Sequence, residues 1–275
     1  MRLVTFEQDG KSKVGVRVDG GVVPLPYTDM ASLIRAGDEG LEAAKHAAEV
    51  GEPVEGRLLA PVRPQTILAS GPNYASHAEE NPGATPPTEP FFFSKLPSAV
   101  IGPGEAIVIP YPDTQTDWEV ELAMVIGRRA KRLSAHSALD SVFGWTILND
   151  VSARDVQLSG GQLTMGKCPD TFAPLGPEIV TSDEIGDWSE MRVSTTVNGT
   201  TMQDAPTSEM LFSPGRMLEF ITALITLEPG DVVSTGTPAG VAVFRDPPPY
   251  LRPGDVVTVA VDRIGELTNP VAAGW

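Results

Sequence analysis

Short apolar runs separated by turn-forming residues recur through most of the chain, and they limit the fold more than any other feature. After residue 60, runs typical of β-strands are TILAS, AIVIP, VELAMVIG, FGWTILNDV, MRVSTTVNG, DVVSTG and DVVTVAVDRIGEL. Helical candidates are few, at residues 135–142 and 213–226. The 27 glycines and 26 prolines favour turns over long helices. The sequence therefore predicts a mainly β (α+β) fold, arranged as a barrel or roll.

The first sixty residues have a different pattern. Residues 1–25 alternate apolar and polar side chains around DG turns, which predicts two or three short strands. Residues 29–50 are expected to be helical. We therefore expect a small N-terminal α/β domain over residues 1–60 and a main domain over residues 61–275.

Charge and composition limit the partners. The formal charge of −16 predicts a surface that repels nucleic acid and anionic membranes. The N-terminus has no apolar core typical of a signal peptide, and no run approaches a membrane span, so we expect a cytoplasmic protein. Cys168 is the single cysteine, which excludes an intrachain disulfide and a Cys-based zinc site. Asn198-Gly199 is expected to form a hairpin turn.

Acidic residues interrupt the apolar stretch DWEVELAMVIG. Glu119 and Glu121 are two positions apart, so in a strand they project to the same face, as does Asp117. Asp150 ends a second apolar run, FGWTILND. Buried, these carboxylates would repel one another unless a cation neutralised them, and an oxygen-ligand site suits Mg²⁺, Mn²⁺ or Ca²⁺. The alternative is a solvent-facing strand edge with ordinary surface acids.

From about residue 70 to the C-terminus, the chain resembles the fumarylacetoacetate hydrolase (FAH) family. The segments that carry this resemblance, in order, are GPNYASHAEE, DWEVELAMVIG, LNDVSARD, GKCPDTFAPLGP, VNGTTMQDAPTSEML, LEPGDVVSTGTPAGV and LRPGDVVTVAVDRIGEL. The resemblance implies a mixed β-roll around a divalent metal, usually Mg²⁺ or Mn²⁺. It also implies a bacterial-type member with a small N-terminal domain, and commonly a homodimer.

The same resemblance implies roles for individual residues. The implied metal ligands are Glu119, Glu121 and Asp150. The implied catalytic residues are Lys167, beside the metal, and a His77–Glu80 dyad on a segment that closes over the site. The implied substrate contacts are Thr237, Gln203, Arg154 and Tyr74. Residues 81–97 and 242–250 are expected to set selectivity for the distal half of the substrate.

Family substrates chelate the metal as 2-oxo or β-diketo acids, which leads to three hypotheses. The first is a hydrolase that cleaves a C–C bond in an acylpyruvate or fumarylpyruvate-like acid through a metal-stabilised enolate. The second keeps the site but decarboxylates an oxaloacetate-like acid or isomerises a 2-hydroxydienoate. The third is a noncatalytic protein that binds a small molecule or a metal.

Overall fold

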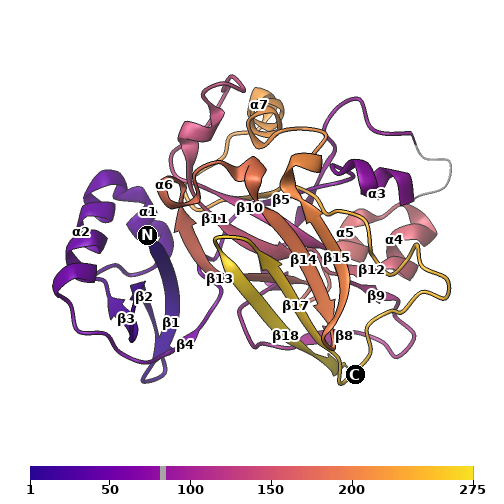
Figure 1. Ribbon diagram of the computed structural model, residues 1–275, viewed down its shortest axis with the longest axis horizontal. Helices are drawn as coiled ribbons and strands as arrows, with labels where there is room; N and C mark the ends of the chain where they lie inside the picture. The colour runs from indigo at the N-terminus through magenta and orange to yellow at the C-terminus, as the bar shows by residue number, and fades with distance from the viewer. Residues whose placement is uncertain (81–84, 275) are drawn as a thin grey trace.

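The computed structural model describes residues 1–80 and 85–274. Within them, a large mixed sheet packs against a smaller antiparallel-rich sheet (Figure 1). The large sheet has the order β3-β2-β1-β13-β11-β10-β16-β5-β6, with β4 on β1 and β7 on β13. Its strands are β1 (Arg2–Gln8), β2 (Lys11–Val18), β3 (Gly21–Pro24), β4 (Arg57–Leu58), β5 (Ile67–Ser70), β6 (Phe92–Lys95), β7 (Val100–Ile101), β10 (Val120–Ile126), β11 (Val142–Asn149), β13 (Ala173–Thr181) and β16 (Val232–Ser234).

The smaller sheet has the order β15-β14-β17-β18-β8, and a short two-stranded ladder joins β12 to β9. These strands are β8 (Ile107–Ile109), β9 (Thr116–Asp117), β12 (Ser152–Ala153), β14 (Arg192–Val197), β15 (Thr200–Pro206), β17 (Val256–Val261) and β18 (Gly265–Ala273). The fold is thus the mixed β-roll that the sequence predicted. The expected hairpin turn is also confirmed, since Asn198 and Gly199 join β14 to β15 with positive φ angles of 51° and 79°.

Helices are short and lie around the sheets. They are α1 (Met30–Arg35), α2 (Gly37–Val50), α3 (Ala75–Glu80), α4 (Arg154–Gly160), α5 (Leu163–Lys167), α6 (Ser182–Ile185) and α7 (Pro214–Leu224), with 3-10 turns η1 (Pro97–Ala99), η2 (Ala138–Ser141), η3 (Trp188–Glu190) and η4 (Thr207–Glu209). The helix expected over residues 29–50 is therefore two helices, the one over 213–226 is α7, and the one over 135–142 is the shorter turn η2. In the described part of the chain, no helix has the length and apolarity that a membrane crossing requires.

Strand β10 lies at the centre of the core and is buried on both faces. Leu122 and Met124 join the apolar core between the two sheets, with Val193 of β14 and Val259 of β17. Ala123 faces a second core cluster, which it shares with residues of the N-terminal helices. This complete burial explains why an acidic residue on β10 must find a charged or polar partner inside the protein.

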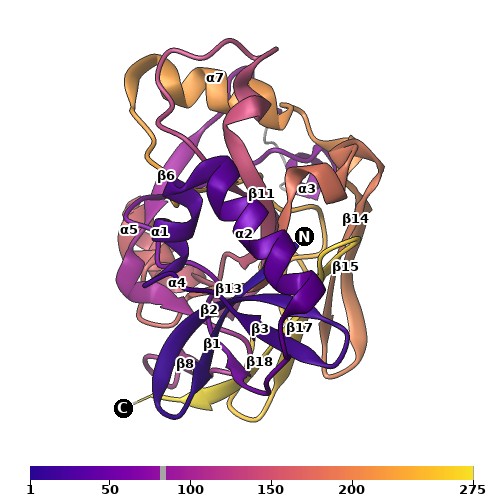
Figure 2. The same cartoon turned by 90° about the vertical axis from the view of Figure 1, so that its left-hand side faces the viewer.

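The N-terminal segment continues the large sheet. Strand β1 pairs with β13 at Arg2↔Val180 and Leu3↔Ile179, and α1 and α2 lie over β1–β3 (Figure 2). The boundary near residue 60 stays a prediction, because this pairing makes one sheet of both parts. The homodimer and the cytoplasmic location also stay predictions.

Replacing Glu178 with alanine is expected to loosen this junction. Its buried carboxylate pairs with Arg2 and lies 3.1 Å from Arg17, so it joins β1 and β2 to β13. Hydrogen bonds to charged groups contribute about 2 kcal/mol, which corresponds to a fall of about 5 °C in the melting temperature. Glu190→Ala is the control, because the Glu190–Arg263 pair is exposed and should contribute little. Equal melting temperatures for both variants would contradict the assignment.

Candidate metal centre

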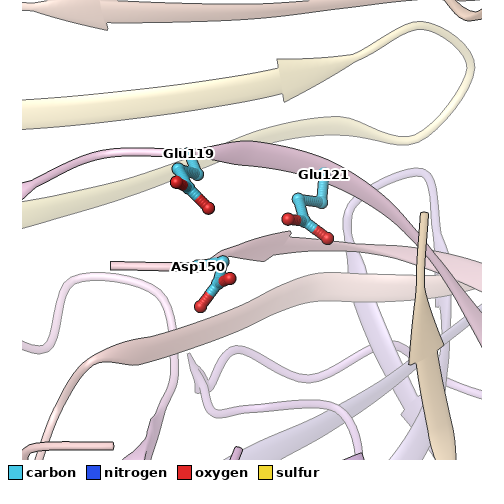
Figure 3. Close-up of side chains that lie close together, drawn as sticks. All are labelled: Glu119, Glu121 and Asp150. Carbon is cyan, nitrogen blue, oxygen red and sulfur yellow. The ribbon is translucent and has the colours of Figure 1, made fainter. Parts of the chain in front are cut away.

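Three carboxylates meet where β10 begins and β11 ends. Glu119 directly precedes β10, Glu121 is the second residue of β10, and Asp150 directly follows β11. The backbone N–H of Asp150 donates to the carbonyl of Glu119 at 2.8 Å, which fixes the two segments side by side. One carboxylate oxygen from each residue lies within 4.8 Å of the other two, and Figure 3 shows the three groups turned toward one another. All three residues are buried, so the alternative of solvent-facing surface acids is wrong.

Two buried lysines neutralise part of this charge. Lys167 Nζ donates to Glu119 Oε2 at 2.7 Å and to Asp150 Oδ2 at 2.8 Å. Lys95 Nζ, at the end of β6, donates to Asp150 Oδ1 at 2.6 Å and to the carbonyl of Val151 at 3.1 Å. Sequence reasoning placed Lys167 beside the ligands but missed Lys95. The available signal was a lysine at the end of the apolar run FFFSK, because a lysine that is buried there needs a charged partner.

Arg154 joins Glu119 to a fourth acid, Asp117. Its Nη2 donates to Glu119 Oε1 at 2.6 Å and its Nε to Asp117 Oδ2 at 2.9 Å. Asp117 also accepts hydrogen bonds from the backbone N–H groups of Trp118, Ala242 and Val243, at 2.8, 2.7 and 3.1 Å. Both Asp117 oxygens are therefore used by the protein. Asp117 orients Arg154 and the 242–243 loop, and it does not join the three-carboxylate cluster.

The charge states of Glu119 and Lys167 follow from these contacts. Burial alone would raise the pKa of Glu119, but Lys167 and Arg154 outweigh it and lower the pKa to about 2. Burial would likewise lower the pKa of Lys167, but Asp150 and Glu119 outweigh it and raise that pKa. Glu119 and Lys167 therefore form a stable ion pair at neutral pH.

Glu121 has the strongest need for a cation. Its Oε2 accepts hydrogen bonds from the Ser234 hydroxyl and, at 3.0 Å, from the backbone N–H of Gly236. Its Oε1 is buried and has no hydrogen-bond partner among the described residues. Burial, followed by the charges of Asp150 and Glu119, raises the pKa of Glu121. A divalent cation bound by the three carboxylates would supply the missing partner, so these residues fit an oxygen-liganded ion such as Mg²⁺ or Mn²⁺.

The predicted dyad lies on α3. His77 Nδ1 is 3.1 Å from Glu80 Oε2, and Glu80 Oε1 accepts the backbone N–H of Gly240 at 2.6 Å. The Phe244 ring lies 5.9 Å from the His77 ring, between centroids. Phe244 belongs to the 242–250 segment expected to set selectivity. Of the other expected segment, residues 81–84 lie outside the described residues.

The predicted substrate contacts Gln203, Thr237 and Tyr74 differ in how many of their hydrogen-bonding groups are already used within the protein. Gln203 uses all its amide positions within the protein: it donates to Thr237 Oγ1 (2.7 Å) and to a carbonyl, and accepts from a hydroxyl and a backbone N–H. Its direct contact with substrate stays a prediction, and its hydrogen bonds indicate that it holds Thr237. Because Thr237 Oγ1 accepts that bond, its own proton is left to donate. The buried Tyr74 hydroxyl has no partner among the described residues.

The family can now be stated from a direct match. Residues 66–272 match the family model described as fumarylacetoacetate (FAA) hydrolase C-terminal. The chain belongs to the FAH family. The match covers the whole three-carboxylate cluster and both residues of the dyad, so the FAH resemblance drawn from short motifs is confirmed.

Similar proteins within the FAH superfamily catalyse different reactions. The mitochondrial oxaloacetate tautomerase fahd2 of Xenopus laevis is 40% identical over 288 residues, covering 98% of this chain and 90% of that protein. A fumarylacetoacetate hydrolase structure from Exiguobacterium antarcticum is 38% identical with a TM-score of 0.88, covering 99% of both chains. Maleylpyruvate hydrolase from Sphingobium sp. SYK-6, in complex with manganese(II) and pyruvate, is 29% identical with a TM-score of 0.84 over all of both chains. The protein is therefore an enzyme of this superfamily, in which the reaction varies between members.

Proposed function

We propose that the protein interconverts the enol and keto forms of an oxaloacetate-like 2-oxo acid, with a divalent cation held by Glu119, Glu121 and Asp150. The observation that carries the proposal is the buried, unpaired Glu121 oxygen within a cluster of three acids. The similarity to an oxaloacetate tautomerase over 98% of the chain supports this choice of reaction. The second hypothesis from the sequence named decarboxylation of an oxaloacetate-like acid or isomerisation of a 2-hydroxydienoate on the same metal site. Keto–enol interconversion is an isomerisation on that site, and we place it ahead of C–C hydrolysis.

The charge inside the site suits an anionic substrate. Among the described residues, the buried charged side chains of the three-carboxylate cluster and its bonded partners comprise four carboxylates and three cations, so a divalent ion changes their formal sum from −1 to +1. These side chains are Asp117, Glu119, Glu121, Asp150, Lys95, Arg154 and Lys167. A positive, water-poor site attracts a carboxylate and stabilises negative charge that develops on a neighbouring oxygen.

Each chemical requirement has a residue to meet it. When bound, the cation would act as a Lewis acid toward the 2-oxo oxygen. Glu80 accepts a hydrogen bond from His77 Nδ1–H, which leaves Nε2 free to take a proton from the substrate carbon next to the oxo group and to return it. Lys167, held beside the acids, adds positive charge for the enolate. Thr237 has a hydroxyl proton to donate to the substrate carboxylate.

The proposal is tested by adding the enol form of oxaloacetate to the protein with Mg²⁺, Mn²⁺ or excess EDTA. We expect the ultraviolet absorbance of the enol to decay faster with either ion, and this acceleration to be lost with EDTA. Pyruvate is assayed in the same samples, because decarboxylation releases it and tautomerisation does not. An enol decay rate equal to that of protein-free buffer with each ion would overturn the proposal.

Hydrolysis of a C–C bond is the second candidate, and the dyad favours it. A histidine oriented by a carboxylate can activate water as readily as it can move a proton on carbon. The similarity to a maleylpyruvate hydrolase supports it as well. Acetylpyruvate, fumarylpyruvate and maleylpyruvate are the test substrates. Metal-dependent release of pyruvate from one of them, faster than the enol decay of oxaloacetate, would make hydrolysis the main activity.

A further inference from the structure

Helix α3, which carries the dyad, depends on contacts with the rest of the protein for its position. Helix α3 has 6 residues, and helices this short are unstable without tertiary contacts. Ala78 is its one buried residue, so apolar packing contributes little. Figure 1 shows α3 at the outer edge of the molecule. Polar attachments must therefore fix α3 over the acidic cluster.

One such attachment uses no residue of the dyad. Ser76, in the first turn of α3, donates from Oγ to Glu209 Oε2 at 2.9 Å. Ser76 Oγ also accepts the backbone N–H of Ala239 at 3.4 Å. Glu209 ends η4, and the next residue, Met210, forms a β-bridge with Tyr74, just before α3. The bridge and the side-chain bond thus attach the start of α3 to the same short segment.

A further attachment of α3 among the described residues is the hydrogen bond that the backbone N–H of Gly240 donates to Glu80. It lies at the opposite end of the helix and involves a member of the dyad. The two attachments together leave α3 little freedom to rotate. If the Ser76–Glu209 bond were lost, the first turn of α3 would be held by the Tyr74–Met210 bridge and the long Ala239 contact.

Glu209 and the implied metal ligand Glu121 both act on Tyr74. Tyr74, which forms the bridge two residues before Ser76, is buried, and burial, Glu121 and then Glu209 raise its pKa. The charges of Glu209 and of the implied metal ligand Glu121 therefore reach the same phenol. The attachment at the start of α3 is therefore linked through Tyr74 to the same electrostatic environment as Glu121.

We infer that Glu209 is a positioning residue that holds α3, and with it the His77–Glu80 dyad, over the metal centre by accepting the hydrogen bond of Ser76. The inference depends on the proposed function only for the dyad's part in catalysis. The attachment itself is a property of the fold and can be measured without a substrate.

The test compares Ser76→Ala, Glu209→Ala and Glu209→Gln with the parent protein. Hydrogen exchange of the peptide that covers α3 reports its opening, while kcat, KM and Mg²⁺ affinity report the site. We expect exchange in α3 to rise about tenfold and kcat to fall about tenfold in both alanine variants, with KM and Mg²⁺ affinity within about twofold of the parent. Glu209→Gln keeps a carbonyl acceptor and should stay within about threefold of the parent in every measurement.

Matched controls come from exposed positions. Ser134→Ala removes a hydroxyl that bonds Ser137, and Glu219→Ala removes a carboxylate that bonds Arg216, so neither should change α3. Unchanged α3 exchange in both Ser76→Ala and Glu209→Ala would overturn the inference, as would unchanged kcat beside faster exchange. If the parent turns over no 2-oxo acid, the proposed function fails, and hydrogen exchange alone still decides whether the attachment exists.

Discussion

Replacing Glu121 with glutamine is expected to abolish binding of the divalent cation while leaving the ion-free protein at least as stable as the parent. The amide carbonyl can still accept the hydrogen bonds of Ser234 and Gly236, so the fold keeps its contacts. The amide group lacks the charge that the unpaired Oε1 offers to a cation. Loss of the Lewis acid removes several kcal/mol of transition-state stabilisation, so activity should fall by roughly 1,000-fold.

Thermal melting separates these two effects. At 100 times its dissociation constant, Mg²⁺ should stabilise the parent by about 2.7 kcal/mol, or roughly 5–10 °C, and should not stabilise Glu121→Gln. The control is Glu178→Gln, which alters a buried carboxylate outside the metal centre. That variant should melt earlier but keep the full response to Mg²⁺. A Mg²⁺-induced rise in Glu121→Gln equal to that of the parent would contradict the assignment of Glu121 as a ligand.

The pH dependence of the ion-free protein follows from the same carboxyl group. The pKa of Glu121 is higher in the folded protein than in the unfolded chain. The protonated carboxyl group therefore contributes its full stabilisation below the unfolded-state pKa. This stabilisation is lost as the pH rises through the folded-state pKa. The glutamine variant does not titrate there. In EDTA, its stability advantage over the parent should therefore grow with pH. The stabilisation of the parent by Mg²⁺ should grow over the same range, because the cation removes the cost of ionising Glu121.

Local spacing indicated which side chains share a face, and the FAH resemblance implied the metal ligands and the dyad. The i, i+2 spacing of Glu119 and Glu121 and the i, i+3 spacing of His77 and Glu80 are geometric properties of one strand and one helical turn. The partners that these residues need were harder to find. Lys95 reaches Asp150 across 55 residues of chain, and Glu209 reaches Ser76 across 133. Only the folded topology brings such pairs together, so no periodicity in the sequence marks them.

The fold shows the same difference between elements marked by local sequence patterns and elements that depend on long-range contacts. The sequence analysis placed β10, β11 and β17 within apolar runs and α7 at a clear helical spacing. It missed β13, whose segment APLGPEIVT contains two prolines that argue against a central strand. It also missed α4 and α5, which lie in the glycine-containing stretch RDVQLSGGQLTMGK. Tertiary contacts decide those segments: β13 pairs with both β1 and β11, and Arg154 of α4 and Lys167 of α5 are held by the buried acids.

Replacing His77 with alanine is expected to lower the rate of proton transfer on the 2-oxo acid by about 100- to 10,000-fold while leaving cation affinity unchanged. The ring supplies the proton-transferring nitrogen, whereas the cation ligands lie just before β10, on β10 and after β11. The decisive measurement is exchange of the substrate's C3 protons with deuterium in heavy water, followed by nuclear magnetic resonance in the presence of Mg²⁺. It detects enolisation whether or not a C–C bond later breaks. His46→Ala is the control, because His46 lies on α2 in the N-terminal segment. Deuterium exchange in His77→Ala at the parent rate would remove His77 from the proton transfer and assign that step to another base.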